Sequence, residues 1–218
     1  MSLKFDGKTV DYFEKFPRHV ERVGISLSGG ADSALILYLL AKEIQDREQE
    51  TRIYPIHGYD LSRKNVHSWE VAEAVIRTVK YDLRDWANII KKPHIFAYDK
   101  TLPISKEDYH NANYEYMKRR YDLDFIIRGV TQGMPSDHRP LSKGDSSSSE
   151  LSRLSKETWV LPFGDVDKKF IAHWYNELNL DRLLSMTSSC IADQTEPCEE
   201  CWWCKEKYWA FGQYDAVG

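Results

Sequence analysis

Short apolar runs alternate along most of this chain with longer stretches in which apolar residues recur every three or four positions. The short runs predict strands, and they cover residues 23–27, 53–57, 94–98, 123–127 and 159–161. Recurrence every three or four positions is typical of one face of a helix. Strands that alternate with helices predict an α/β fold, a parallel twisted sheet with helices on both faces. Ligands of such a sheet collect at the carboxyl ends of its strands.

The first predicted helix, residues 34–41, is apolar nearly all round, so we expect it to pack on the sheet. Residues 4–16, around Gly7, predict a small hairpin or an edge element, and Gly58 is expected to end the second strand. The other predicted elements are an apolar helical stripe over 66–79, a short amphipathic piece over 86–90, a polar and aromatic helix over 106–121, and a helix over 168–178 capped by Asp165 or Asp167.

The most informative stretch follows the first strand. Residues 28–33, Ser-Gly-Gly-Ala-Asp-Ser and here called the SGGADS segment, join that strand to the first helix. Glycines permit positive φ and leave backbone amides open to a ligand, and successive amides at a helix N-terminus form an anion site. The hydroxyls of Ser28 and Ser33 add donors for a pyrophosphate. Ordinary turns and caps use the same residue types, so the six residues together, more than the glycine pair, favour phosphate binding.

The SGGADS segment resembles the signature loop of the ATP pyrophosphatase superfamily, whose members cut ATP between its α and β phosphates. The Walker pattern Gly-x-x-x-x-Gly-Lys-Ser/Thr does not occur in this chain. A carboxylate beside phosphates needs a cation, so Asp32 predicts Mg²⁺ bound together with ATP. The ATP-binding residues that the resemblance implies are Leu27, Ser28, Gly29, Gly30, Ala31, Asp32, Ser33, Ala34 and Gly129.

Composition narrows the class of protein. The 218 residues suffice for one α/β domain and a small appendage. A net charge of −4 gives no basic field, so no direct nucleic-acid partner is expected. The N-terminus does not have the pattern of a signal peptide, and no apolar run approaches the roughly 18 residues of a membrane span. We expect a cytoplasmic protein with an N-terminal extension (1–22), an ATP pyrophosphatase domain (23–186) and a C-terminal zinc-binding segment (187–218).

All four cysteines lie near the C-terminus. Cys190, Cys198, Cys201 and Cys204 follow the pattern C-x7-C-x2-C-x2-C. Cys-x-x-Cys turns direct two sulfurs to one centre, and four thiolates complete the tetrahedron that structural Zn²⁺ prefers. Charged neighbours such as Glu196 make the segment too polar for inert core thiols. A redox pair or an iron–sulfur cluster could use the same motif, but four ligands without an open position favour a structural zinc knuckle.

From about residue 23 to residue 211, the chain resembles the 7-cyano-7-deazaguanine synthase family. The cysteines stand at that family's zinc-site spacing, and the Leu161-Pro162 pair followed by Lys168 is similar to its conserved proline and lysine. Residues 137–140, Asp-His-Arg-Pro, are similar to an Asp-Cys-Arg-Pro segment of the family.

Three departures from the family pattern stand out. His138 replaces a cysteine, and Glu199 replaces the glycine that usually follows the second zinc cysteine. The loop over residues 129–137 is shorter than the family's and has no counterpart of the aspartate normally found there. That loop lies near the base pocket in the family, so its shortening affects the expected substrate more than the expected adenylation.

The resemblance implies a reaction with a small heterocyclic carboxylate, 7-carboxy-7-deazaguanine being the first candidate. ATP would adenylate the carboxylate, ammonia would give an amide, and a second ATP would allow a nitrile to form, with AMP and pyrophosphate released. Ser28, Asp32, Ser33 and Lys168 are the implied catalytic residues, with Lys168 and Mg²⁺ neutralising charge on pyrophosphate. A solvated lysine at a helix start is the alternative interpretation of Lys168.

Three further residues are candidate substrate contacts. Arg128 and Arg139 would clamp a carboxylate, although surface ion pairing is an equal alternative for both. Asp137 would accept the adjacent donors of a guanine-like edge. Residues 144–149, Gly-Asp-Ser-Ser-Ser-Ser, indicate either a solvated loop or a lid over substrate.

Two other classes of function remain open on the sequence, as does the formation of a homodimer. One is another ATP pyrophosphatase, amide-forming or tRNA-modifying, although a tRNA thiolase would need a catalytic cysteine outside the metal site. The other is a non-catalytic zinc-knuckle module in which Trp202 and Trp203 stack on bases. Exposed tryptophans would favour that module, whereas Glu199 and Glu200 beside them disfavour it.

Overall fold

The computed structural model describes residues 1–61, 68–135, 159–190, 192 and 196–215. Its centre is a five-stranded sheet in the order β5-β4-β3-β6-β7 with every neighbouring pair parallel. The strands are β3 (Arg22–Ser26), β4 (Arg52–Asp60), β5 (His94–Tyr98), β6 (Phe125–Arg128) and β7 (Trp159–Val160). The predicted parallel α/β sheet is confirmed.

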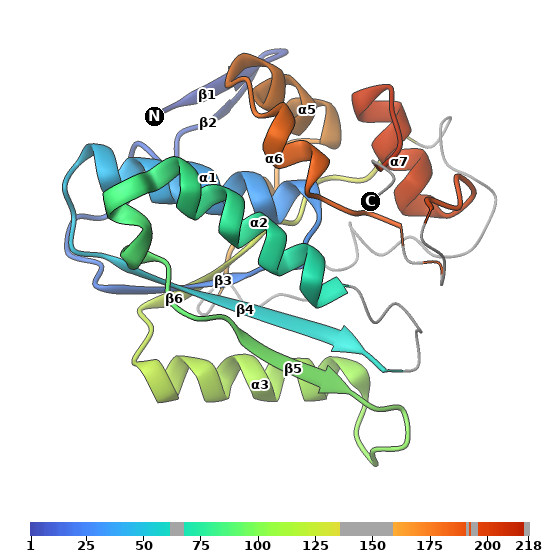
Figure 1. Ribbon diagram of the computed structural model, residues 1–218, viewed down its shortest axis with the longest axis horizontal. Coiled ribbons are helices and arrows are strands. Elements are labelled where there is room, and N and C mark those ends of the chain that lie inside the picture. Colours follow the sequence, from blue (N-terminus) through green and yellow to red (C-terminus); the bar gives the residue numbers. More distant parts are fainter. Residues whose placement is uncertain (62–67, 136–158, 191, 193–195, 216–218) are drawn as a thin grey trace.

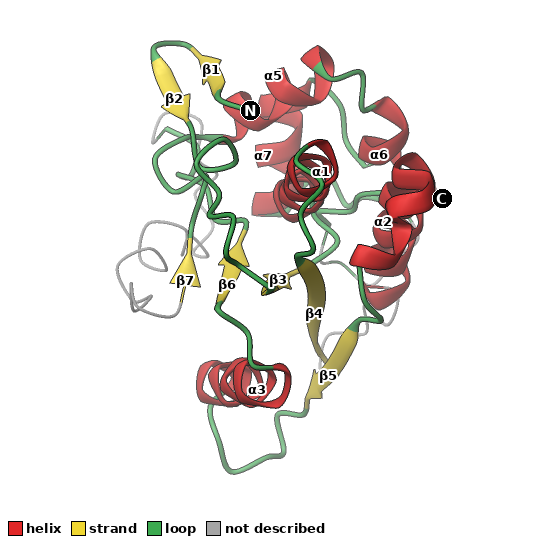
Figure 2. Ribbon diagram, turned by 90° about the vertical axis from the view of Figure 1, so that its left-hand side faces the viewer, coloured by secondary structure: helices red, strands yellow, loops and turns green. Residues whose placement is uncertain are grey.

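Helices cover both faces of this sheet, as predicted (Figures 1 and 2). One face carries α3 (Lys106–Tyr121). On the other side lie α1 (Ala31–Asp46), α2 (Ser68–Leu83), α5 (Lys168–Glu177), α6 (Asp181–Ser185) and α7 (Trp202–Phe211). A 3-10 helix, η1 (Arg84–Ile89), continues α2 where a short amphipathic piece was expected. None of the helices in the described part of the chain is long and apolar enough to cross a membrane.

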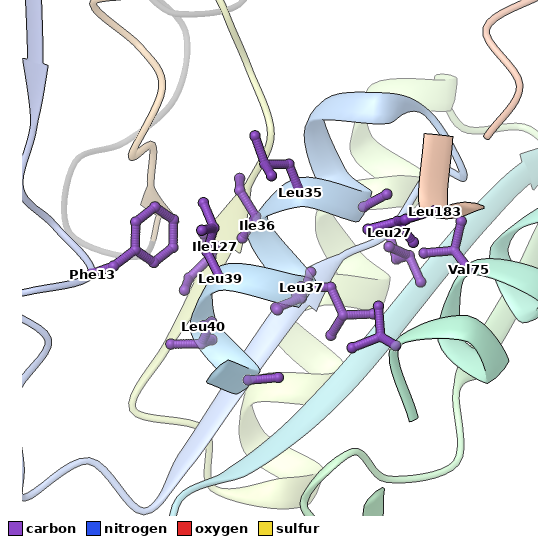
Figure 3. Packing of buried hydrophobic residues seen from close by; sticks show 14 of the residues in the cluster. Phe13, Leu27, Leu35, Ile36, Leu37, Leu39, Leu40, Val75, Ile127 and Leu183 are labelled. Atoms are coloured by element: carbon purple, nitrogen blue, oxygen red, sulfur yellow. The ribbon is translucent and has the colours of Figure 1, made fainter. Parts of the chain in front are cut away.

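Helix α1 is the centre of the larger core, as its all-round apolar sequence predicted. Its consecutive side chains Leu35, Ile36 and Leu37 are each 0% exposed, because the sheet lies on one side and α2 and α5 on the other (Figure 3). Burying one such side chain contributes about 1.5–3 kcal/mol relative to leaving it in water. The start of α1 is therefore held on a rigid base.

A smaller core lies between the sheet and α3. Of the α3 residues, only Tyr114 and Met117 are buried, and they pack with Ile56, Phe96 and Ile126 from three strands. Ser105 caps this helix by accepting a hydrogen bond from the Asp108 N–H at 3.0 Å. The polar composition of α3 thus fits a helix that contacts the sheet through a narrow strip.

The N-terminal segment forms the predicted hairpin, β1 (Leu3–Phe5) and β2 (Lys8–Val10), which pair antiparallel. The turn between them places Gly7 at a φ of +72°, where glycine is favoured. Phe5 stacks on His173 of α5 with ring centroids 4.2 Å apart. The hairpin is thereby attached to the helix that carries Lys168.

Strand β4 differs from the prediction, because it continues past Gly58 to Asp60. A Cβ atom at Gly58 would lie 2.5 Å from the Phe96 ring on β5, so this glycine makes room for a neighbouring side chain and does not end the strand. Helix α7, which begins directly after Cys201, is a second difference from the predicted elements.

Candidate functional site

The SGGADS segment lies where the strand order reverses. Strand β3 pairs with β4 on one side and with β6 on the other, and this switch point is where open α/β sheets bind ligands. Gly129, which follows β6, lies directly against the start of α1, since a Cβ there would be 2.8 Å from the Ser33 nitrogen. The structure therefore brings together two predicted parts of the site that are far apart in sequence.

The SGGADS segment holds its two hydroxyls against its own backbone. Gly29 has a φ of +86° and turns the chain, while Gly30 is the extended N-cap of α1. The Ser28 and Ser33 hydroxyl oxygens are 3.2 Å apart; Ser33 donates to the Gly30 carbonyl at 3.0 Å, and Ser28 accepts from the Gly30 N–H at 3.3 Å. The first N–H groups of an α-helix have no partners within the helix. Amides and hydroxyls are thus gathered at one helix end, as an anion requires.

Lys168 lies beside this helix end and is 7% exposed, so the alternative of a solvated lysine is wrong. Its ammonium forms a close ion pair with Asp32, and the Glu206 carboxylate of α7 lies 3.5 Å from it. Burial alone lowers the pKa of Lys168, but the negative charges of Asp32 and Glu206 outweigh it and hold the pKa above its ordinary value. Lys168 therefore keeps its positive charge at the start of α1.

The second carboxylate oxygen of Asp32, Oδ1, is buried and has no hydrogen-bond partner among the described residues. An unpartnered buried carboxylate oxygen is costly, whereas a hard cation such as Mg²⁺ binds to carboxylate oxygens. The site is thus chemically suited to a divalent cation at Asp32. Nearby, Tyr175 donates a hydrogen bond of 2.9 Å to the Ala31 carbonyl, and burial together with the Asp32 charge raises the pKa of Tyr175.

Arg128 ends β6 on the α3 side of the switch point. Its guanidinium lies over Trp159, 5.0 Å from the ring centroid, and 5.9 Å from that of Tyr114. The Tyr114 hydroxyl is 2.6 Å from the Ser26 hydroxyl at the end of β3. Of the predicted substrate contacts, Arg128 thus lies near the SGGADS segment, on aromatic faces.

Several charged and imidazole side chains near Arg128 were not predicted as site residues from the sequence. Lys106 of α3 forms a 3.0 Å ion pair with Asp60 at the end of β4, and His57 donates from Nδ1 to the Leu27 carbonyl at 2.7 Å. Burial, reinforced by the charges of Lys106 and Arg128, lowers the pKa of His110 to about 4. The position of His57 at the end of a predicted strand could have drawn attention to it, whereas Asp60 lies beyond the predicted end of that strand.

The four cysteines converge as the spacing predicted. Their sulfur atoms all lie within 4.8 Å of one another, and those of Cys198 and Cys204 are 3.9 Å apart. In a tetrahedral zinc site with Zn–S bonds of about 2.3 Å, sulfurs are about 3.8 Å apart. Backbone N–H groups of Cys198 and Cys201 point at sulfurs of the cluster at 3.3 and 3.4 Å. This group could bind one metal ion such as zinc.

The segment that contains the cysteines, residues 188–215 and here called the cysteine segment, is also hydrogen-bonded to the SGGADS segment. The Ser188 N–H donates to the Gly29 carbonyl at 3.1 Å. Asp215 accepts from the N–H groups of Ser189 and Cys190 at 2.7 and 2.9 Å and forms a close ion pair with Lys207, whose side chain is 2% exposed. A buried charge pair therefore fixes the chain between the cysteine cluster and the SGGADS segment.

Several predicted features lie outside the described residues: Asp137 and Arg139 with the rest of segment 137–140, and the serine-rich stretch 144–149. Trp202 is described and is 7% exposed. It offers little surface for stacking on a base, whereas Trp203, the other tryptophan of the binding-module alternative, is half-buried.

No protein-family model and no curated protein sequence matches the chain. Among solved structures, the NH3-dependent NAD synthetase of Campylobacter jejuni in complex with the nitrate ion is similar at 17% identity, with 78% of this chain and 70% of that one covered and a TM-score of 0.40. The glutamine-dependent NAD+ synthetase of Acinetobacter baumannii in complex with ADP is similar at 15% identity, with 83% of this chain and 34% of that one covered and a TM-score of 0.47. A protein of the universal stress protein family from Burkholderia pseudomallei is similar at 12% identity, with 65% of this chain and 95% of that one covered and a TM-score of 0.41. At these levels of similarity, function has to be inferred from the side chains of the site.

Proposed function

We propose that this chain is an ATP-dependent ligase that splits ATP into AMP and pyrophosphate. The observation that carries the proposal is the combination at the start of α1. There, the SGGADS hydroxyls and the buried cation Lys168 lie together with the Oδ1 atom of Asp32, which has no hydrogen-bond partner among the described residues, at the switch point of the sheet. These groups suit a pyrophosphate with its divalent cation.

The reaction begins with a carboxylate, a poor electrophile because its oxygens leave badly. A carboxylate oxygen attacks the α-phosphorus of ATP, the bond to the β-phosphate oxygen breaks, and pyrophosphate leaves. Ammonia then attacks the acyl carbon and AMP departs, which leaves an amide. The amide oxygen attacks a second ATP in the same way, and loss of AMP with the nitrogen-bound protons gives a nitrile.

In this reaction the chain's residues stabilise the departing charge. Ser28, Ser33 and the first amides of α1 donate hydrogen bonds to pyrophosphate, and Lys168 supplies a positive charge at short range. Asp32 would hold Mg²⁺, which offsets the charge of the phosphates when it is bound. Gly129 keeps the end of β6 close to these groups without a side chain between them.

We further propose that the cysteine cluster holds a structural zinc ion. Cys190, Cys198, Cys201 and Cys204 would fill all four positions of a tetrahedral ion and leave none for substrate. None of the four forms a disulfide in the described structure, which suits a reducing compartment such as the cytoplasm.

The proposed acceptor is 7-carboxy-7-deazaguanine, with ammonia as the nitrogen source and 7-cyano-7-deazaguanine as the product. The resemblance of the cysteine spacing and of segment 137–140 to the synthase family supports this choice. Arg128 would pair with the substrate carboxylate. The shortened 129–137 loop supports a pocket that reads the base less strictly than in the family.

The test is to incubate the protein with ATP, Mg²⁺, ammonium and 7-carboxy-7-deazaguanine, separate AMP from ADP, and look for the nitrile by mass. Ser28→Ala and Asp32→Asn are expected to slow AMP formation by roughly tenfold to a thousandfold, whereas the exposed Asp165→Asn should not. Release of ADP and phosphate would refute the proposed ligase. AMP formed only with another acid would refute the proposed substrate and leave adenylation standing.

A further inference from the structure

Glu206 is the least expected member of the charged group at the start of α1. It lies on α7 and is 6% exposed, and its Oε2 atom is 3.5 Å from the Lys168 ammonium. Lys168 contacts Asp32 closely as well. One buried ammonium is therefore shared by two buried carboxylates, and neither the SGGADS segment nor the cysteine pattern accounts for the second one.

A second buried carboxylate is costly if Lys168 only has to neutralise Asp32. Desolvating an ion costs several kcal/mol in a protein interior, and burying Glu206 beside Lys168 adds such a cost to that of burying Asp32. A single carboxylate would be enough to hold Lys168 in place. The arrangement is better explained if one of the two carboxylates has another cation to bind.

Asp32 is the carboxylate with that second partner. It lies in the first turn of α1, and its Oδ1 atom has no hydrogen-bond partner among the described residues. A divalent cation on Asp32 would repel the nearby ammonium of Lys168, because like charges a few ångströms apart interact strongly away from water. Lys168 then needs an anion other than Asp32, and Glu206 already lies beside it.

We propose that Glu206 is a positioning residue that retains Lys168 when Asp32 binds the Mg²⁺ of the nucleotide. Lys168 then shifts between two carboxylates without leaving the site, and its charge stays available to the phosphates. This inference rests on the Mg²⁺-dependent nucleotide binding of the proposed function. It makes Glu206 a determinant of Mg²⁺ affinity, through Lys168, with no contact between Glu206 and the nucleotide.

The experiment measures the Mg²⁺ concentration that gives half-maximal binding of α,β-methylene-ATP, by calorimetry, for the wild-type chain and for Glu206→Gln. The substitution preserves shape but leaves Lys168 with Asp32 as its only full counter-charge in the described part of the chain, so Mg²⁺ competes less well. We expect the half-maximal Mg²⁺ concentration to rise about tenfold. Glu200→Gln, the same change at an exposed position of the cysteine segment, should leave it unchanged.

Glu206→Asp keeps the charge on a shorter side chain and tests the idea if the Gln variant does not fold. Because the shorter side chain draws the carboxylate away from Lys168, its half-maximal Mg²⁺ concentration should also rise, but by less than that of Glu206→Gln. A lower melting temperature with unchanged Mg²⁺ dependence in both variants would show that Glu206 is only structural and overturn the inference. Absence of Mg²⁺-dependent binding in the wild type would instead refute the proposed function, and the inference with it.

Discussion

Gly129→Ala should damage the site through a single added methyl group. The Cβ would lie 2.8 Å from the Ser33 nitrogen and 3.0 Å from the Asp32 carbonyl carbon. Both are backbone atoms at the start of α1, and they cannot turn away as the end of a side chain can. The end of β6 and the start of α1 would therefore have to separate.

The size of the effect follows from these distances. Carbon atoms pack best at about 3.5–4.0 Å, so the backbones must separate by roughly 0.5–1 Å. Overpacking of this kind costs about 1–3 kcal/mol of the free energy of unfolding. For a chain of this length, each kcal/mol lowers the melting temperature by about 2–4 °C, so a decrease of roughly 2–12 °C is expected. Movement of Ser33 and Asp32 should also weaken nucleotide binding by about tenfold or more.

The assay is thermal unfolding with and without Mg²⁺ and α,β-methylene-ATP, for Gly129→Ala and for Gly30→Ala as a control of stability. At Gly30 the nearest heavy atom to an added Cβ is 3.4 Å away and the backbone has an ordinary φ of −77°. That variant should lose no more than about 1 kcal/mol, because alanine is a poorer N-cap than glycine but meets no close backbone atom. If Gly129→Ala unfolds at the wild-type temperature and binds nucleotide normally, the close contact between β6 and α1 is not required.

Three further predictions follow from buried groups. Cys201→Ser should lower the zinc content, measured by elemental analysis, below one ion per chain. Iron in the wild-type protein together with a visible charge-transfer band would contradict the zinc assignment. Asp215→Asn removes the carboxylate that neutralises the buried Lys207 ammonium and should cost about 3–5 kcal/mol in urea unfolding. This expectation fails if the exposed Asp165→Asn costs as much. The pKa of His110 is lowered to about 4 by burial, below the roughly 6.5 of an unfolded histidine. The unfolded chain therefore takes up the proton first, and the stability that is present above pH 6.5 is lost as pH falls towards 4. His110→Gln should reduce this loss, the exposed His19→Gln should not, and equal pH profiles would refute the assignment.

The order of strands and helices could be predicted because its signals are local. The bounds of β5 and of α3 agree with the predicted ranges 94–98 and 106–121. The start of α5 was marked by Asp167, whose side chain accepts the Phe170 N–H at 3.1 Å. Apolar spacing and capping residues act within a few positions of one another, so a single sequence contains them.

The charged contacts of the site could not be predicted, because they join residues that are far apart in the chain. Nothing near Lys168 in sequence indicates that it is buried between Asp32 and Glu206. Gly58 ends a strand by local rules, yet here it makes room for Phe96 on the next strand. In each case the tertiary neighbour decides the residue's role.

The C-terminal segment has a larger part in the site than a zinc knuckle at the end of the chain suggests. Ser188, two residues before Cys190, donates to the Gly29 carbonyl, and Glu206, two residues after Cys204, lies 3.5 Å from Lys168. A metal ion that held both Cys190 and Cys204 would therefore fix two contacts. One is the hydrogen bond from Ser188 to the SGGADS backbone, and the other is the contact between Glu206 and Lys168. These two contacts make the cysteine segment part of the proposed nucleotide site, because they act on the backbone and on the charge that would receive the pyrophosphate.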